Sequence, residues 1–334
     1  MEGTHCRSPL PGRIIPLKAV RGFISILVMV LVLAGNAFAL PFRVVGYFES
    51  WTGGEEYVQY DYLTHINYAF LVPEEDGGLG NNDTDQIRNL VRLAHAKNVK
   101  VSISVGGWND GDDSGLQAIA SSAGTRAVFI NNLMAFVAAN GLDGVDMDWE
   151  FPEGASDNYA ALMSELSARL HGQGKLLTAA VGGWDAFGVP ASVFQHVDFL
   201  NLMTYDGGNP HSSYDAAVDS INYWKGRGLS REKMVLGVPF YCREPYQSYE
   251  SLVARDASVP TRDQNGYENV NGCYYNSIPT IRKKTTLAAD QASGIMIWAL
   301  SMDTEGSTSL LLAIHNAAVP SQKIPSFPTN IQIR

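Results

Sequence analysis

The chain has 334 residues, of which 46% are hydrophobic and 17% are charged, and 24 Lys and Arg against 34 Asp and Glu give a formal net charge of −10. This composition is typical of a folded globular protein, so it excludes a disordered chain and a protein with many membrane spans. The acidic balance provides no broad positive surface, and we therefore expect no nucleic-acid partner.

The first 39 residues have a pattern of their own. Basic residues within 13–21 precede an apolar run at 24–34, and small residues flank Phe38. This order is typical of a secretory signal peptide, and we expect cleavage after Ala39. The alternative is an uncleaved anchor, but the apolar run is shorter than the roughly 20 residues that a membrane-spanning helix needs. The prediction is a secreted, extracellular protein with no stable membrane insertion after cleavage.

Cleavage at this point would remove one of the three cysteines and leave Cys242 and Cys273. In an exported protein such a pair can form a disulfide that closes the stretch between them. Two free thiols remain the alternative.

Beyond residue 40, short apolar or alternating runs bounded by Gly, Asn or Asp predict strands, and apolar residues at helical spacing predict helices between them. The predicted strands are 42–48, 65–71, 99–105, 142–148, 175–181, 197–205, 233–240 and 294–300. The predicted helices are 83–97, 124–139, 156–171, 213–226, 279–291 and 306–317. The connections near 55–61 and 189–195 are too short for a prediction.

Strands that alternate with helices pair in parallel, and eight such units predict a closed (β/α)₈ TIM barrel, an α/β fold. An open doubly wound sheet is the alternative. We assign residues 40–318 to one barrel domain and 319–334, which contain three prolines and no periodic pattern, to a C-terminal tail. A barrel requires that the chemistry collect at the carboxyl ends of its strands.

The strongest signal for function is the run DGVDMDWE at 143–150, at the end of the fourth predicted strand. Because side chains alternate along a strand, Asp146, Asp148 and Glu150 share one face and the apolar residues between them share the other. We expect the carboxylates to face the barrel interior. Three neighbouring carboxylates cannot all ionise cheaply, so a proton shared along the row raises the pKa of a group that can then serve as an acid.

Two other interpretations of this run are a solvated acidic turn and a Mg²⁺ or Ca²⁺ site. A solvated turn would not alternate with Val, Met and Trp. A hard cation accepts carboxylate oxygens, but neither phosphate-binding glycines nor the spacing of a calcium loop lies nearby. The histidines and cysteines also lack metal-binding spacings. We therefore predict acid–base chemistry without a metal or another cofactor.

The eight-residue run resembles the D-x-x-D-x-D-x-E signature of glycoside hydrolase family 18, the chitinases and their relatives. The continuation WEFP at 149–152 resembles the chitinase branch. Ser104–Trp108 (SVGGW) is similar to the S-x-G-G segment of the family, Met203–Asp206 (MTYD) to its M-T-Y-D segment, and Trp298 to its tryptophan beneath the substrate. The resemblance extends over nearly all of 42–317.

The resemblance implies a retaining hydrolase in which the substrate supplies the nucleophile. It implies that Glu150 protonates the glycosidic oxygen and that the 2-acetamido carbonyl of the sugar then forms an oxazolinium ion, which water opens. Asp148 would stabilise that ion, Asp146 would share a proton with Asp148, and Tyr205 would hold the acetamido oxygen.

Further residues at or just past the strand ends are expected to bind substrate. Aromatic faces there can stack on sugar rings, although core packing is the alternative for each of them. Asp206 is expected to bind substrate or to orient the acid, and a loop carboxylate without function is its alternative. The predicted substrate-binding residues are Tyr47, Phe70, Trp108, Met203, Asp206, Tyr241 and Trp298.

The expected substrates are chitin and N-acetylglucosamine oligosaccharides, bound by a monomer. Many chitinases carry a sizeable insertion after the seventh strand, whereas the stretch 242–278 reads as a long loop that is too short for it. We therefore expect an open cleft that suits cleavage inside a chain. The alternatives are an endo-β-N-acetylglucosaminidase that acts on N-glycans and a non-catalytic chitin-binding lectin.

Overall fold

The computed structural model describes residues 42–318. The predicted signal peptide at 1–39 and the predicted tail at 319–334 lie outside the described residues. Within 42–318, no helix is both long enough and apolar enough to cross a membrane.

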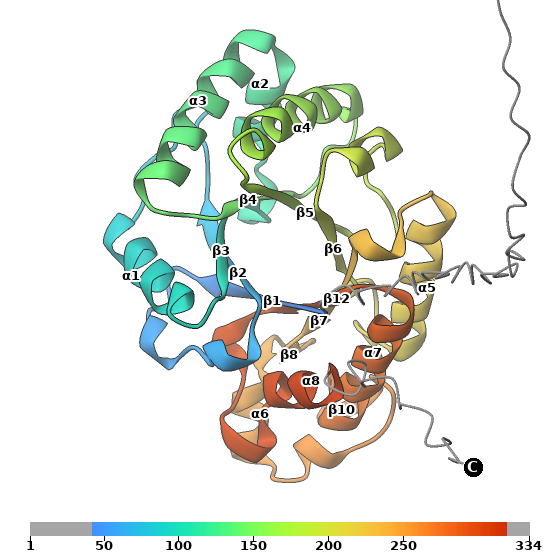
Figure 1. The fold of residues 1–334 in the computed structure, drawn as a ribbon. Helices are drawn as coiled ribbons and strands as arrows, with labels where there is room; N and C mark the ends of the chain where they lie inside the picture. Colours follow the sequence, from blue (N-terminus) through green and yellow to red (C-terminus); the bar gives the residue numbers. More distant parts are fainter. Residues whose placement is uncertain (1–41, 319–334) are drawn as a thin grey trace, which may run out of the picture. The chain divides into compact units, whose positions relative to one another are not determined.

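Eight parallel strands close into a barrel in the order β1-β12-β7-β6-β5-β4-β3-β2 (Figure 1). This closed order confirms the predicted TIM barrel and excludes the open sheet. The barrel strands are β1 (Arg43–Glu49), β2 (His65–Leu71), β3 (Lys100–Gly107), β4 (Gly144–Trp149), β5 (Leu176–Gly182), β6 (Phe199–Met203), β7 (Met234–Pro239) and β12 (Gly294–Trp298). Each lies within a few residues of its predicted range.

Helices surround the barrel, and several begin at residues whose side chains bond the free N–H groups of the first turn. Asp83 caps α1 through the backbone N–H groups of Asp85 and Gln86, and Ser122 caps α3 through that of Thr125. The α-helices are α1 (Thr84–His95), α2 (Ser114–Ser121), α3 (Ala123–Ala139), α4 (Ser156–His171), α5 (Tyr214–Gly226), α6 (Tyr249–Arg255), α7 (Ile278–Gln291) and α8 (Leu310–Ala318). Sequence patterns did not predict α2 or α6, each of at most eight residues.

The connections that were too short to predict contain 3₁₀ turns. These are η1 (Glu55–Tyr57) and η2 (Tyr60–Tyr62) after β1, and η4 (Ala191–Gln195) after β5. Five similar turns lie elsewhere: η3 (Asn109–Gly111), η5 (Arg231–Lys233), η6 (Val259–Thr261), η7 (Leu300–Met302) and η8 (Gly306–Thr308).

The stretch after β7, predicted as one long loop, contains regular structure. Two small antiparallel sheets and helix α6 lie there, and a disulfide joins Cys242 to Cys273. The strands are β8 (Tyr241–Cys242), β9 (Gln247–Ser248), β10 (Glu268–Val270) and β11 (Cys273–Tyr275). Such two- and three-residue strands are too short for a periodic pattern, which is why the sequence did not reveal them. We call residues 241–277 the β7–α7 segment.

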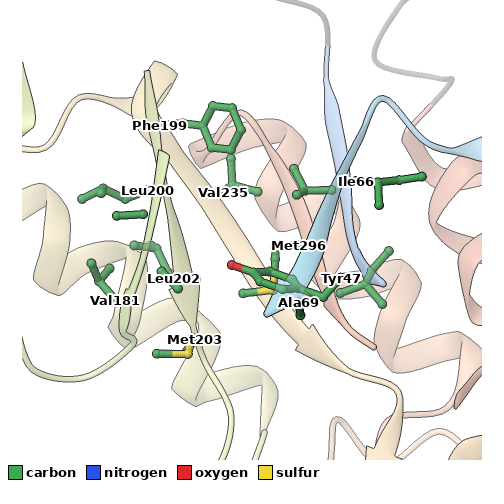
Figure 2. Close-up of a cluster of buried hydrophobic side chains, with 14 of the residues drawn as sticks. Tyr47, Ile66, Ala69, Val181, Phe199, Leu200, Leu202, Met203, Val235 and Met296 are labelled. Carbon is green, nitrogen blue, oxygen red and sulfur yellow. The ribbon is translucent and has the colours of Figure 1, made fainter. Parts of the chain in front are cut away.

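The core fills both sides of the barrel wall. Figure 2 shows part of a cluster of buried hydrophobic side chains contributed by β1, β2, β5, β6, β7 and β12. On β4, Trp149 lies on the helix side, where its ring packs against Tyr159 of α4 at a centroid distance of 5.8 Å. The alternate residues Asp146 and Asp148 therefore face the barrel interior, as the strand pattern predicts.

Candidate active site

A pocket of about 390 Å³ lies at the carboxyl ends of the barrel strands. All the predicted catalytic and substrate-binding residues line it except Asp146 and Tyr241. They come from strands or strand ends all around the barrel, which is the location that the fold predicts for chemistry.

The glycines before Trp108 allow β3 to pass close to the carboxylate strand. Gly106 pairs with Asp148 and has φ +107°, and a Cβ atom there would lie 2.3 Å from the carbonyl oxygen of Asp148. Any larger residue would push the two strands apart. The glycines of the SVGGW run therefore allow β3 and β4 to pack closely at the edge of the pocket.

Asp146 is fully buried and accepts four hydrogen bonds from four other strands. The donors are Tyr47 Oη at 2.7 Å, Ser104 Oγ at 2.9 Å, Thr178 Oγ1 at 2.5 Å and Asn201 Nδ2 at 3.1 Å. Burial raises the pKa of Asp146, and the side-chain hydrogen bonds oppose that increase. Both carboxylate oxygens are occupied, and no hydrogen bond joins Asp146 to Asp148 in residues 42–318. The sharing of a proton between Asp146 and Asp148 therefore stays a prediction.

Asp148 lies above Asp146 on the same strand face and is 3% exposed. Its Oδ1 atom has no hydrogen-bond partner within the described chain. Burial raises the pKa of Asp148 well above its usual value, and the neighbouring Glu150 and Asp146 raise it further. Asp148 therefore favours the protonated form and presents a buried polar atom beside the pocket.

Glu150 follows the last residue of β4 and lines the pocket. Burial raises its pKa to about 7, and the negative charge of Asp206 contributes to the increase. Asp148 and Glu150 are neighbouring carboxyl groups, and each raises the pKa of the other. Asp206 adds a further negative charge from the loop after β6, which the sequence pattern alone does not predict. A carboxyl with this pKa can donate a proton near neutral pH.

Asp206 is held by three donors. Arg243 approaches its Oδ2 atom at 2.6 Å, while Tyr241 Oη and His211 Nδ1 lie 2.8 and 3.1 Å from Oδ1. Burial alone would raise the pKa of Asp206, but the hydrogen bonds from His211, Arg243 and Tyr241 lower it below its usual value. Asp206 is therefore an anion, and His211 Nδ1 carries the hydrogen in their contact.

Two of the predicted sugar-binding aromatics are almost fully buried. Tyr47 and Tyr241 are each 1% exposed, although Tyr47 contributes to the pocket lining. Their hydroxyl groups bond carboxylates, Tyr47 that of Asp146 and Tyr241 that of Asp206. The position of a residue at a strand end does not predict these hydrogen bonds, because it does not show which groups meet across the barrel.

The other predicted residues line the pocket. Trp298 packs against Phe70 at a centroid distance of 5.5 Å with an interplanar angle of 16°, and Trp108 is 59% exposed. Met203 is buried in the wall, and the hydroxyl of Tyr205 lies 3.7 Å from Sδ of Met296. The pocket thus combines carboxyl groups with flat apolar surfaces.

Sequence reasoning missed Trp184, Phe151 and Arg243, which also line the pocket. Trp184 had a signal, because Val-Gly-Gly-Trp at 181–184 repeats the sequence at 105–108 at the end of another barrel strand. The Trp184 ring lies over Gly207, where a Cβ atom would be 2.7 Å from Cε3, and it remains 49% exposed. Arg243 lies in the β7–α7 segment and had no such signal.

Comparison with known families gives one clear match. The model described as "Glycosyl hydrolases family 18" matches residues 43–303, which include every barrel strand.

Individual relatives agree with this match. A probable endochitinase of Caenorhabditis elegans is 32% identical in an alignment of 249 positions that covers 59% of this chain and 40% of that protein. A probable chitinase 10 of Drosophila melanogaster is 23% identical in an alignment of 385 positions that covers 87% of this chain and 17% of that protein. The chain therefore matches less than half the length of either relative.

Among solved structures, the chitinase ChiB of Flavobacterium johnsoniae superposes with a TM-score of 0.75 and 30% identity. The match covers 84% of this chain and 94% of that structure. The fold is therefore shared over most of this chain and nearly all of that structure.

Proposed function

This chain belongs to the glycosyl hydrolases of family 18, and from that premise we propose that it is a chitinase. It cleaves β-1,4 bonds between N-acetylglucosamine units inside a chain and retains the anomeric configuration. The observation that carries this proposal is the row of Asp146, Asp148 and Glu150, which leads along one face of β4 to an aromatic-lined pocket.

Glu150 is the proton donor in the proposed reaction. Its carboxyl gives a proton to the glycosidic oxygen as the bond from that oxygen to the anomeric carbon breaks. The pKa of about 7 supports this role, because an acid is effective when its pKa lies near the working pH. In the second step the Glu150 carboxylate removes a proton from the attacking water and returns to its acid form.

The nucleophile is the substrate's own 2-acetamido oxygen, which bonds to the anomeric carbon and forms an oxazolinium ion. The alternative is a protein carboxylate, and the two neighbours of Glu150 are poorly suited to that role. The raised pKa of Asp148 favours its protonated form, and Asp206 is engaged by three donors that include Arg243. This difference supports substrate assistance.

Asp148 and Tyr205 orient the acetamido group. The unpartnered Oδ1 atom of Asp148 accepts a hydrogen bond from the acetamido N–H. Once Asp148 has passed its proton to Asp146, its carboxylate stabilises the positive charge of the intermediate. The hydroxyl of Tyr205, whose only hydrogen-bond contact in the described chain is the weak acceptor Met296 Sδ, donates to the acetamido oxygen.

The aromatic residues bind the sugar chain. Trp298 supports the sugar at the cleaved bond, while the exposed faces of Trp108 and Trp184 bind sugars further along. The compact β7–α7 segment leaves the pocket open, and this supports cleavage inside a chain. The enzyme acts as a monomer without a metal or another cofactor.

We also propose that the protein is exported, with the signal peptide removed after Ala39. The Cys242–Cys273 disulfide supports this, because structural disulfides persist mainly in oxidising compartments. Edman sequencing of protein recovered from culture medium should begin at Leu40. Retention of all material inside the cell would contradict export.

The reaction is tested with a hexamer of N-acetylglucosamine, with the products followed by ¹H NMR from the first minutes. We expect internal cleavage, seen as trimers or as paired dimers and tetramers, with the β-anomer at each new reducing end. An α-anomer would exclude retention. Fully deacetylated chitosan lacks the internal nucleophile and should not be cleaved.

Parallel assays separate the two alternatives. Release of a high-mannose glycan from a glycoprotein, without hydrolysis of the hexamer, would favour an endo-β-N-acetylglucosaminidase. Hexamer binding without any cleavage between pH 4 and pH 9 would favour a lectin.

A further inference from the structure

The loop that carries Asp206 is held by contacts with residues outside it. This β6–α5 loop (residues 204–213) joins β6 to α5. Asp206 has φ +66°, a left-handed conformation that is uncommon outside glycine, although aspartate adopts it more often than most residues do. Such a residue persists where the surrounding structure fixes it. The position of the charge that acts on Glu150 therefore depends on the contacts of this loop.

Ser212 connects the two ends of the β6–α5 loop. Its hydroxyl donates to the carbonyl oxygen of Thr204 at 2.8 Å, across the eight-residue separation. The adjacent residue His211 is buried and contacts Asp206. A displacement of Ser212 would therefore shift Asp206 both through Thr204 and through His211.

Lys284 of α7 fixes Ser212 by hydrogen bonds. Its Nζ atom donates to the backbone oxygen of Ser212 at 2.8 Å, to Ser212 Oγ at 2.7 Å and to Asn276 Oδ1 at 2.7 Å. The amide of Asn276 donates in turn to the Ser212 backbone oxygen at 2.8 Å. An ammonium has three donors, and all three have acceptors here.

The environment of Lys284 argues against a role in packing alone. The side chain is fully buried, and no carboxylate oxygen within residues 42–318 lies at salt-bridge distance from Nζ. Burial lowers the pKa of Lys284 to about 7, and the charge of Glu268 counteracts this shift. A buried charge without an ionic partner is costly, and a methionine would fill the same space without that cost. The benefit of a lysine here is its three hydrogen bonds.

Glu268 has a separate role in the same region. Its Oε2 accepts from the backbone N–H of Gly266 at 2.6 Å and its Oε1 from Ser277 Oγ at 2.6 Å, and it is also bonded to the hydroxyl of Thr280. These contacts fix β10 to the first turn of α7. The end of the β7–α7 segment that bears Asn276 is thus a rigid support.

We propose that Lys284 is a positioning residue for the active site, which fixes the β6–α5 loop against the β7–α7 segment and so keeps Asp206 beside Glu150. This inference rests on the proposed role of Glu150 as the acid. If so, α7, a helix on the outside of the barrel, contributes through Lys284 to the proton affinity of Glu150.

The test compares Lys284→Met with the matched control Lys283→Met. Lys283 is the preceding residue on the same helix, and it forms an exposed ion pair with Asp263. In Lys284→Met we expect backbone amides of residues 204–213 to exchange hydrogen at least roughly tenfold faster, while the barrel strands keep their protection. We also expect the alkaline limb of kcat/KM to move to lower pH by roughly half a unit or more, because Asp206 no longer holds up the pKa of Glu150. Lys283→Met should change neither.

A second variant, Ser212→Ala, keeps the test decisive if Lys284→Met does not fold. It removes one hydroxyl, leaves the lysine two acceptors, and should move both readouts in the same direction by a smaller amount. Faster exchange spread evenly over the barrel, or an unmoved alkaline limb in a folded variant, would overturn the inference. If the unmodified protein hydrolyses no chitin oligomer, the proposed function fails, and hydrogen exchange alone then decides whether Lys284 holds the loop.

Discussion

Burial and the negative charge of Asp206 together raise the pKa of Glu150 to about 7. Asp206 can exert this effect because Arg243, Tyr241 and His211 keep it ionised. Asp206 is therefore held as an anion, and Glu150 is available as an acid.

The Asp206→Asn variant should shift the pH dependence of hydrolysis. Glu150 must be protonated to act, so kcat/KM falls as the pH rises through its pKa. Removal of the neighbouring negative charge lowers that pKa, and the alkaline limb should move to lower pH. The measurement is kcat/KM for the hexamer from pH 4 to pH 9. Asp61→Asn, which alters an exposed ion pair with Lys97, serves as the control and should leave the limb in place.

The Glu150→Gln variant should lose most turnover and keep its affinity for substrate. An amide retains the shape of the side chain but cannot donate the proton, and general acid catalysis typically contributes about 10²- to 10⁴-fold. We expect kcat for the hexamer to fall by roughly that factor, with the dissociation constant from calorimetry within about threefold. Glu153→Gln, at an exposed position three residues further on, should behave like the parent protein. Full activity in Glu150→Gln would refute the assignment of the acid.

The Tyr47→Phe variant should be less stable. It removes one of the four donors to a buried carboxylate, and a hydrogen bond to a charged group contributes about 1–3 kcal/mol. Urea unfolding should show a decrease of that size in the free energy of unfolding. In Tyr57→Phe the side chain is 74% exposed, and the change should stay within about 0.5 kcal/mol. Equal effects of the two changes would mean that the contact with Asp146 is not stabilising.

The Trp184→Ala variant should weaken the binding of long substrates. Loss of one stacking surface worth about 1.4 kcal/mol raises KM for the hexamer roughly tenfold, with little effect on a dimer analogue that does not reach it. Gly207→Ala should have a similar effect, since a Cβ atom there displaces the Trp184 ring. Tyr267→Ala removes an exposed aromatic that does not line the pocket, and its KM should not change. A length-independent effect of Trp184→Ala would contradict a role in binding distant sugars.

The sequence by itself determined the features that depend on the spacing of apolar and polar residues along one strand or helix. Each barrel strand is a short run with its own pattern, and the alternation of side chains placed Asp146 and Asp148 on one face and Trp149 on the other without any knowledge of the fold. The same reasoning directed attention to the carboxyl ends of the strands, where Glu150, Trp108 and Trp298 do line one pocket.

Only the tertiary structure decided which groups meet across the barrel. Asp146 receives hydrogen bonds from residues 32 to 99 positions away, and Asp206 is paired with Arg243 on a segment that had no periodic pattern. These contacts shift the pKa of Glu150 upward and that of Asp206 downward, because a pKa depends on burial and on charges nearby in space. They also include the hydrogen bonds from Tyr47 and Tyr241 to carboxylates, which the positions of these residues in the sequence do not predict.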